Sequence, residues 1–580
     1  MARSGFAGPA TGAAALAATA GLVFDAGGFD AVSWDRALVL LAAAAFGLVV
    51  LVGVERPGRP ALLTVGALAG LTAWTAASWL WAASPPTALE EAQRIGCYLA
   101  AALVVVVAGR RAPLHWLLGG VAAGIVAAAC WNLALRLAPD WTGRSARTDI
   151  GALADPVGYG NGLALLDAVG IVLLLGIAVA ASSRPLRLIA AALLVPVAAD
   201  LALLSSTGAV AALAAALLVF GLTAGRRAGW SALALLLLPA LGALAVRRVH
   251  AVVSPQFGNE LAAAPSGHRL LAGLALVTAA QVAGAWLLLP LLARLPALPR
   301  RVGAAAALLL AAAGLAAAPF ALRGHDRYRY WRVAAREAAA HPVLGGGAGS
   351  YVDWWVRTRS VPLSTQEAHS LYLETLAELG PLGLLLVAAA LGVPLVSAIR
   401  LRETRWGPPV LAALVAYDVH AAVDFDWELA GVTLPIVLLG AGAAVAVSPP
   451  VVELGARRRA VLSLAAACLA AAGILALAGS SPLAAAADAE AAGRYETALT
   501  RAHRALRFAP WSAEAWDVIG RARMAQGDRA GARAAFGSAV RLDPAAWQAW
   551  LELADASAAG PRRAALAEAA RLNPFWASGQ

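Results

Sequence analysis

Residues 161–181 read NGLALLDAVGIVLLLGIAVAA, a run of 21 residues that contains one charged side chain. A helix of about 20 apolar residues is long enough to cross the hydrocarbon core of a bilayer. The 580-residue chain has the same character throughout, because 61% of its residues are hydrophobic, 14% are charged and its mean hydropathy is +0.72. Soluble domains carry about 25% charged residues. The composition therefore excludes soluble, disordered, collagen-like and disulfide-scaffold proteins, and it predicts an all-α, polytopic helical membrane protein.

Fifteen apolar segments follow one another along the chain, which predicts about 14–15 transmembrane helices. We expect the first segment to be a retained anchor. A signal peptide also fits it, and cleavage would leave fourteen spans. The segments lie near 9–26, 37–54, 61–83, 95–108, 113–137, 161–181, 186–204, 208–224, 229–246, 270–293, 302–322, 379–399, 408–424, 429–448 and 460–479.

The basic residues are all arginines, and their placement predicts an orientation. Short arginine clusters occupy every second connection, as expected for loops that stay in the cytoplasm. We prefer this interpretation of the net charge of +11 to nucleic-acid binding. The clusters are Arg56/Arg59, Arg110/Arg111, Arg184/Arg187, Arg226/Arg227, Arg294/Arg300/Arg301, Arg400/Arg402/Arg405 and Arg457/Arg458/Arg459. We therefore expect a multi-pass protein of the cytoplasmic membrane, with a cytoplasmic N-terminus and everything after residue 480 outside.

The three cysteines predict neither a disulfide nor a metal site. Cys97, Cys130 and Cys468 lie in or beside apolar runs and have no CxxC spacing. We expect them to be buried, inert thiols.

The composition changes after residue 480, where charged residues return. Pro510 and Pro544 lie 34 residues apart, and so do Trp516 and Trp550. This period and the placement of small and aromatic residues resemble the tetratricopeptide repeat. The sequence thus predicts a transmembrane domain over 1–480 and extracytoplasmic helical repeats over 484–580. The repeats would either hold a protein partner on a concave face or only cap the membrane part.

A long external loop near 323–378 carries the candidate chemistry. Ser364 and Glu367 have capping-box spacing, which predicts a helix from there to about Leu379, ended by Gly380 and Pro381. His369 would then lie in the first turn, where the helix field favours a neutral imidazole able to act as a general base. A structural histidine that caps a loop is the alternative.

Arginines and glycines in the same loop suggest a phosphate site. The arginines can bind phosphate as a planar fork, although a solvated or headgroup-facing helix fits them equally well; they are Arg323, Arg327, Arg329, Arg332 and Arg336. The glycines Gly345, Gly346, Gly347 and Gly349 could present amides to phosphate. No GK[ST] follows them, so a simple turn is expected.

A second polar cluster ends the thirteenth apolar segment. Asp418, His420 and Asp424 are ionisable groups in or near the membrane, where such groups are costly and indicate function. His420 and Asp424 are the members of this second polar cluster that we select as candidate site residues.

Two motifs in the long loop resemble the O-antigen ligase and O-antigen polymerase superfamily. HPVLGGGAGSY (341–351) is similar to its HPxxGxGxGxF pattern, and HSLYLETLAELGPLGLL (369–385) is similar to HNxYLxxLAExGxxG. WAASPPTALEEAQR (81–94), GYGNGLAL (158–165) and VHAAVDFDWELAG (419–431) also look like family segments. The resemblance covers roughly residues 30–450. The chain departs from the pattern at Ser370, where the family has asparagine.

The resemblance implies transfer of a glycan from a polyprenyl-diphosphate carrier, such as undecaprenyl diphosphate, at the outer membrane face. The glycan would be polymerised or attached to a lipid, glycan or protein acceptor. In this scheme His369 is the catalytic base and Arg327 binds the diphosphate, without a metal or another cofactor. A second family arginine is replaced by Thr207 within Ser206-Thr207-Gly208. Arg94, Arg269 or Arg329 would have to compensate for it.

Two other functions remain open at this point. One is an inactive membrane scaffold that recruits envelope partners through the repeat tail. The other is a polytopic transporter, although no repeat among the membrane segments supports it.

Overall fold

The computed structural model describes residues 7–52, 54–143, 148–149, 152–153, 155–224, 228–249, 260–292, 294, 326–448 and 453–577. The expected segment 302–322 and Arg323 lie outside these residues. Helices dominate the described chain, as the composition predicts, and the strands are two antiparallel pieces of two residues each.

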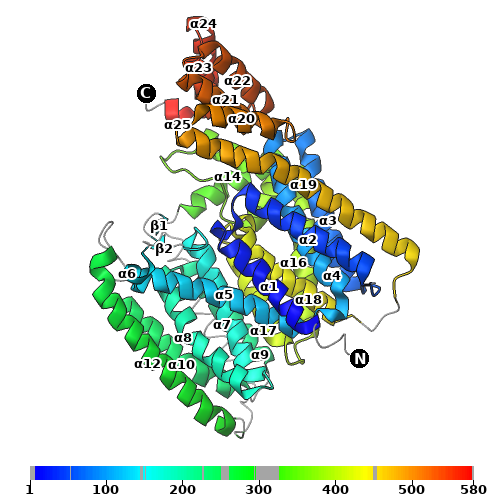
Figure 1. The fold of residues 1–580 in the computed structure, drawn as a ribbon, viewed down its shortest axis with the longest axis vertical. Coiled ribbons are helices and arrows are strands. Elements are labelled where there is room, and N and C mark those ends of the chain that lie inside the picture. The colour runs from blue at the N-terminus through cyan, green and yellow to red at the C-terminus, as the bar shows by residue number, and fades with distance from the viewer. Residues whose placement is uncertain are drawn as a thin grey trace.

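The elements are best located in Figure 1, which labels them along the chain. Those before residue 225 are α1 (Ala7–Val23), η1 (Ala26–Gly28), α2 (Ala31–Leu51), α3 (Arg59–Ala77), η2 (Ser78–Leu80), α4 (Pro85–Ala108), η3 (Gly109–Arg111), α5 (Leu114–Leu137), α6 (Pro139–Thr142), β1 (Thr148–Asp149), β2 (Ala152–Leu153), α7 (Gly160–Ala180), α8 (Arg184–Leu204) and α9 (Thr207–Thr223). From there to residue 491 they are α10 (Ala228–Arg248), α12 (Glu260–Leu292), α14 (Arg327–Ala340), α15 (Tyr351–Thr358), α16 (Leu371–Arg400), α17 (Gly407–Ala421), η4 (Asp426–Glu428), α18 (Ala430–Ala446) and α19 (Ala456–Ala491). The tail continues with α20 (Tyr495–Leu506), α21 (Ala513–Ala525), α22 (Arg529–Leu542), α23 (Trp547–Asp555), α24 (Ala559–Leu572) and α25 (Pro574–Ala577).

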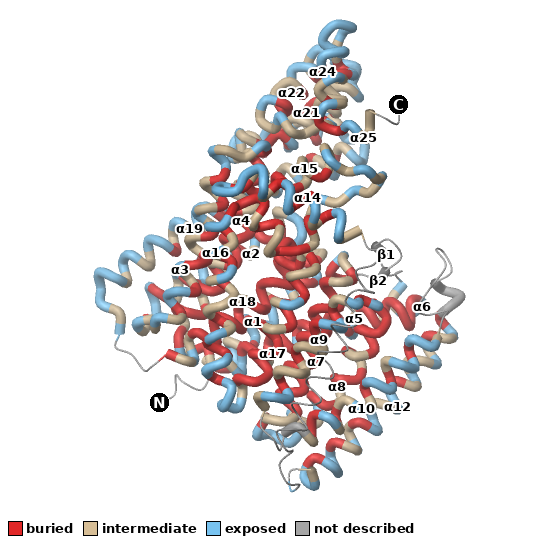
Figure 2. The backbone as a smooth tube through the Cα atoms, turned by 180° about the vertical axis from the view of Figure 1, so that it is seen from behind, coloured by how far each residue is buried: buried red, intermediate tan, exposed pale blue. Residues whose placement is uncertain are grey.

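Two helices form the centre of the apolar part. α7 is buried along nearly its whole length and packs against α5, α8, α9 and α17, and α18 is enclosed by α1, α4, α5 and α16. Figure 2 shows both as buried, whereas α12 and α19 expose much of their length. A helix that is apolar all round must be covered by protein or by lipid. The central pair is covered by protein.

Ten of the described helices are long and apolar enough to cross a membrane, and α1, α9 and α18 are shorter apolar helices. This arrangement is compatible with a multi-pass membrane protein. Fourteen of the fifteen expected segments coincide with described helices, but four of these, α1, α9, α17 and α18, are only 15–17 residues long. The expected count of 14–15 long spans therefore exceeds the ten that the described chain contains.

The connection between the expected apolar segments 61–83 and 95–108 is helical instead. α4 begins at Pro85, directly after Ser84, and continues through the expected apolar segment 95–108, so the helix is longer than that segment. Proline is favoured in the first turn of a helix. Charged residues follow and interrupt the apolar pattern, but they do not end the helix, and Arg94 among them forms ion pairs with Glu91 and Glu428.

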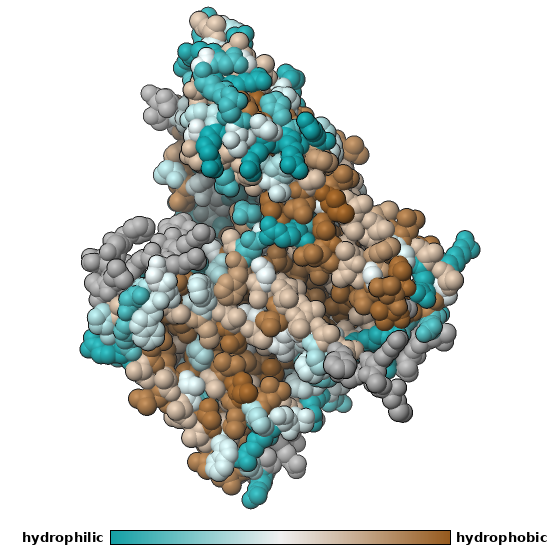
Figure 3. All heavy atoms as spheres, in the orientation of Figure 1, coloured by the Kyte–Doolittle hydropathy of each residue, from teal (hydrophilic) through white to brown (hydrophobic). Residues whose placement is uncertain are grey.

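The tail extends from the apolar part of the molecule without a break, because α19 passes through the expected domain boundary at 480–484. α21 and α23 begin at Ala513 and Trp547, 34 residues apart, and successive tail helices pack on one another. Figure 3 shows hydrophilic side chains gathered over this tail and hydrophobic ones over the part below it.

The cysteines differ from the expectation. Cys97 is buried, but Cys130 and Cys468 are exposed on the surfaces of their helices, and all three are unpaired. Because both exposed thiols lie on apolar helices, apolar surroundings do not imply burial inside the protein.

Candidate active site

α14 brings the first candidate arginine to the protein interior. Its buried residues Tyr330, Val333, Ala334 and Glu337 recur at helical spacing and form one face of the helix. Arg327 precedes Tyr330 by three residues and so lies on the same face. It is also the first residue of the helix.

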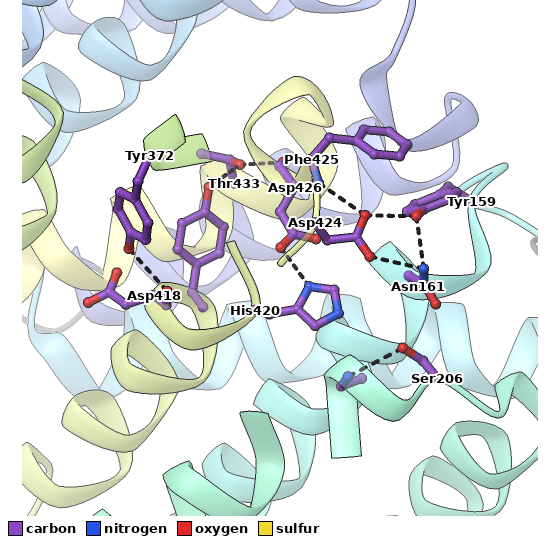
Figure 4. A network of polar contacts seen from close by, with 12 residues as sticks. Tyr159, Asn161, Ser206, Tyr372, Asp418, His420, Asp424, Phe425, Asp426 and Thr433 are labelled. Carbon is purple, nitrogen blue, oxygen red and sulfur yellow. Dashed lines mark hydrogen bonds and ion pairs between the residues drawn. The ribbon is translucent and has the colours of Figure 1, made fainter. Parts of the chain in front are cut away.

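Asp424 holds Arg327 in place. The Arg327 Nη2 atom donates to Asp424 Oδ2 at 2.7 Å, and the Asp424 side chain has no exposed surface. Tyr159 Oη and the Phe425 amide donate to Oδ1 at 2.7 and 3.0 Å, and Asn161 Nδ2 donates to Oδ2 at 2.9 Å (Figure 4). A buried carboxylate is stable only when it is paired in this way. Asp424 is thus a fixed anion that orients the guanidinium.

The Arg327 guanidinium keeps donors for a ligand. Its side chain is 21% exposed, and within the described chain Nε and Nη1 have no hydrogen-bond partner. A planar guanidinium with two open donors is suited to phosphate oxygens. Arg327 is therefore a partly exposed cation, oriented from behind by a buried anion.

His369 lies before α16 and not in its first turn. The expected capping box at Ser364 does not form, because α16 begins at Leu371 and the segment 359–370 is non-helical. His369 has a φ of +52°, in the left-handed region. Its backbone oxygen accepts from Trp331 Nε1 at 3.2 Å, which ties the histidine to α14.

The His369 ring is held between two aromatic side chains. Its centroid lies 5.1 Å from Tyr330 and 4.9 Å from Phe425, the neighbour of Asp424. Nδ1 lies 3.2 Å from the backbone oxygen of Glu367, and because a carbonyl only accepts, Nδ1 carries the hydrogen of the neutral ring. Nε2 then has the lone pair, and no described residue donates to it.

Burial lowers the pKa of His369 below its ordinary value, and the nearby Asp424 opposes this only in part. A lowered pKa keeps the imidazole neutral near pH 7. The geometry therefore presents a neutral ring with an open Nε2 beside an oriented arginine, without the helix field that the sequence suggested.

His420 is paired differently from the expectation. Its Nδ1 lies 2.6 Å from Asp426 Oδ2, and both side chains have no exposed surface (Figure 4). Asp424 is paired with Arg327 instead. The two members of the expected polar cluster, His420 and Asp424, therefore belong to two different ion pairs. His420 Nε2 has no partner in the described chain. Asp418 contributes its backbone oxygen, which accepts from Tyr372 Oη at 3.0 Å.

The other candidate arginines are placed apart from Arg327. Arg94, on α4, is 3% exposed and forms ion pairs with Glu91 and Glu428, so its charge is neutralised inside the protein. Arg329 is half exposed and lies 3.2 Å from Asp326. Arg269 is exposed on α12, where its guanidinium donates hydrogen bonds to the Pro265 carbonyl and the Ser266 hydroxyl of the same helix.

Thr207, where the resemblance led us to expect an arginine, lies in the first turn of α9. Ser206 caps this helix by accepting from the Ala209 amide at 3.3 Å. A Cβ atom at Gly208 would lie 3.1 Å from His420 Nε2. The second buried pair therefore abuts this helix start.

The glycine-rich stretch is a packing turn, as expected, and its amides are in use. The amides of Gly346 and Gly347 donate to the carbonyls of Ala377 and Glu378 at 2.9 and 2.8 Å. Gly345 has a φ of +74°, and a Cβ atom there would lie 2.3 Å from Glu378. The turn therefore packs against α16 just before the non-helical residue Gly380 and uses these two amides to bond its carbonyls. The two amides are not available to phosphate.

Buried carboxylates fasten the loop to the helices. Glu374 Oε2 accepts from the Ala368 amide at 2.7 Å, one residue before His369. Carboxylate oxygens of Glu367, Glu374 and Glu428 lie within 4.8 Å of one another. Such a group could hold a cation, although two of its members already bind Ala368 or Arg94.

Sequence reasoning missed the residues that join these parts. Tyr159, Phe425 and Tyr330 connect Asp424, Arg327 and His369, and Asp426 is the true partner of His420. Aromatic residues carry no motif by themselves. The signal available was the asparagine segment at 158–165, whose Asn161 does reach Asp424.

No family model and no curated protein matches the chain.

Proposed function

We propose that this protein transfers or polymerises a polyprenyl-diphosphate-linked glycan at the outer face of the cytoplasmic membrane. The observation that carries the proposal is the convergence of Arg327, Asp424 and the open Nε2 side of His369, from three distant parts of the chain. A base and a phosphate-binding cation close together are what such a transfer needs.

In the proposed reaction, an acceptor hydroxyl attacks the anomeric carbon of the donor glycan. His369 Nε2 takes the hydroxyl proton as the new glycosidic bond forms. The bond from the anomeric carbon to the diphosphate oxygen breaks, and its electron pair leaves with the lipid diphosphate. Arg327 stabilises the charge on that leaving group. A single displacement of this kind inverts the anomeric carbon.

Asp424 has a positioning role in this scheme. It is buried and does not face the ligand, but it fixes the guanidinium and, through Phe425, lies next to His369. The acceptor would be a lipid, a glycan or a protein. The tail would then lie outside the cytoplasm, where it could bind a protein partner.

Deleting the gene and analysing the lipid fraction tests the proposal. If the protein consumes a lipid-linked glycan, this intermediate should accumulate in the deletion strain and return to its normal level when the wild-type gene is restored. Mass spectrometry of extracted lipids measures both. An unchanged pool of lipid-linked glycans in the deletion strain would refute the proposed function.

One observation favours the transporter instead. Asp167 on α7 and Asp200 on α8 have no exposed surface, and both Asp167 oxygens lack a hydrogen-bond donor in the described chain. Asn132 Nδ2 donates to Asp200 at 2.8 Å. Buried acids between membrane helices often serve proton or ion movement. Loss of proton-coupled uptake in Asp167→Asn, together with an unchanged pool of lipid-linked glycans in the deletion strain, would support this function.

A further inference from the structure

A groove runs between α19 and α20 where the tail leaves the apolar part of the molecule. It has a volume of about 750 Å³. One wall is the α19 surface, with Ile474, Leu477 and Ala478, and the other is α20 and the turn after it. Ile474 is 55% exposed and Phe508 is 40% exposed, so the groove presents apolar surface to its surroundings.

Three arginines form the polar wall of this groove. Arg501, Arg504 and Arg507 line it: the first two lie one turn apart on α20, and Arg507 directly follows the end of that helix. All three are exposed, and none forms an ion pair with a described residue. Three like charges in one groove repel one another unless an anion joins them. The groove thus combines apolar surface with uncompensated positive charge.

The position along α19 indicates what such a groove meets. The helix begins at Ala456, and its apolar sequence runs from 460 to 479 before Ser480 and Ser481. Twenty residues of helix measure about 30 Å, the thickness of a bilayer core. Ile474 would therefore lie inside the hydrocarbon, and the arginines would lie at the level of the headgroups.

The opposite flank of α19 has the reverse charge. A second cavity of about 480 Å³ lies between α19, α2, α4 and α21, with one arginine, Arg36, among several acids. Its acidic lining residues are Asp25, Asp30, Glu90, Asp488 and Glu514. An anion would be attracted to the α19–α20 groove and repelled from this cavity.

We propose that the α19–α20 groove binds an anionic phospholipid of the surrounding bilayer, with an acyl chain on α19 and the phosphate between Arg501, Arg504 and Arg507. The inference rests on the proposed membrane arrangement and is independent of the proposed reaction. Arginine forks suit phosphate oxygens, and basic residues at a membrane surface attract anionic lipid. The bound lipid would fasten the tail to the membrane surface, over the candidate site.

Native mass spectrometry of the full-length chain, taken from micelles with equal amounts of phosphatidylglycerol and phosphatidylcholine of the same acyl chains, tests this. The wild type should retain one phosphatidylglycerol at least about tenfold more strongly than phosphatidylcholine. The triple variant Arg501→Gln, Arg504→Gln, Arg507→Gln should lose that preference. The matched control Arg533→Gln, Arg541→Gln, Arg563→Gln removes three exposed arginines elsewhere in the tail and should keep it.

Several outcomes would overturn the proposal. They are equal retention of both lipids by the wild type, an unchanged preference in the triple variant, and displacement of phosphatidylglycerol by inorganic phosphate or by polyprenyl phosphate. If the triple variant does not fold, the salt dependence of the wild-type protein still tests the proposal. Its preference should weaken as salt rises from about 50 to about 500 mM, because exposed charges are screened. A preference that is insensitive to salt would contradict the arginine site.

Discussion

At the scale of single residues, the account depends on Arg327 as an oriented fork. Arg327→Lys keeps a positive charge near Asp424 but loses the planar pair of donors, so glycan transfer should fall about 10-fold or more. Arg336→Lys, on the exposed side of the same helix, is the matched control and should transfer at the wild-type rate. Transfer can be followed as loss of lipid-linked glycan in isolated membranes. If Arg327→Lys transfers glycan at the wild-type rate and Arg329→Lys does not, Arg329 and not Arg327 binds the diphosphate.

The pH dependence of transfer follows from the environment of His369. Burial lowers the pKa of His369 below its ordinary value of about 6.5, and the base acts in its neutral form. The rate should therefore stay constant as pH falls to 6.5 and decline only at lower pH. Initial rates between about pH 4.5 and 8 measure this limb. A half-maximal rate above pH 6.5 would contradict His369 as the base.

Residue partners were the least predictable feature. The sequence suggested His420 with Asp424, four residues apart, but α17 ends at Ala421 and the chain then turns. Asp424 consequently points to Arg327 and Asp426 reaches His420. Helical spacing holds only inside a helix, so the choice between two nearby aspartates depends on tertiary structure. Arg94 shows the same limit, because nothing local indicates its pairing with Glu428.

At the scale of elements, the apolar runs in the sequence predicted where the helices lie. The charged and polar residues between the runs did not predict where the helices begin. The start of α4 was missed because Glu90, Glu91 and Arg94 interrupt the apolar pattern. They are nevertheless compatible with a helix, in which Arg94 forms an ion pair with Glu91. The start of α16 was placed too early because the capping-box spacing at Ser364 is local. The segment before Leu371 is held instead by Trp331, which donates to the His369 carbonyl, and by Glu374, which accepts from the Ala368 amide.

The glycine turn gives a test at this scale. Gly345→Ala places a Cβ atom at 2.3 Å from Glu378, whereas Gly527→Ala, with a similar positive φ, meets nothing within 4 Å. The difference between the two variants isolates the steric clash, which costs about 1–3 kcal/mol. Protease cleavage within 326–370 in membranes should be about 10-fold faster in Gly345→Ala than in Gly527→Ala. Equal rates would show that this turn does not hold the loop.

At the scale of the whole molecule, the tail lies against the proposed site region. Ser84 Oγ donates to Asp543 at 2.9 Å, and the Arg359 guanidinium lies over the Phe575 ring at 5.3 Å. The 34-residue period predicted the tail helices, but no periodicity could predict this docking. Under the proposed function, this docking would place the tail where it could contact an acceptor.

Thiol labelling tests the proposed orientation. In a background without the three natural cysteines, Ala530→Cys on the exposed surface of α22 should react with an impermeant reagent in intact cells. Arg405→Cys, in an arginine-rich connection expected inside, should react only after lysis. Labelling Ala530→Cys only after lysis would place the tail in the cytoplasm and reject transfer at the outer face.

The most direct measurement of the central claim is the level of lipid-linked glycan in cells whose only copy of the protein is His369→Ala. Loss of a general base costs about 10²–10⁴ in rate. At equal membrane abundance, the variant should accumulate the intermediate as the deletion strain does, and His369→Gln should be nearly as impaired because an amide cannot take the proton. A wild-type level in His369→Ala cells would contradict the account, and it would favour a scaffold or a base elsewhere, with His420 and Asp426 next to be tested.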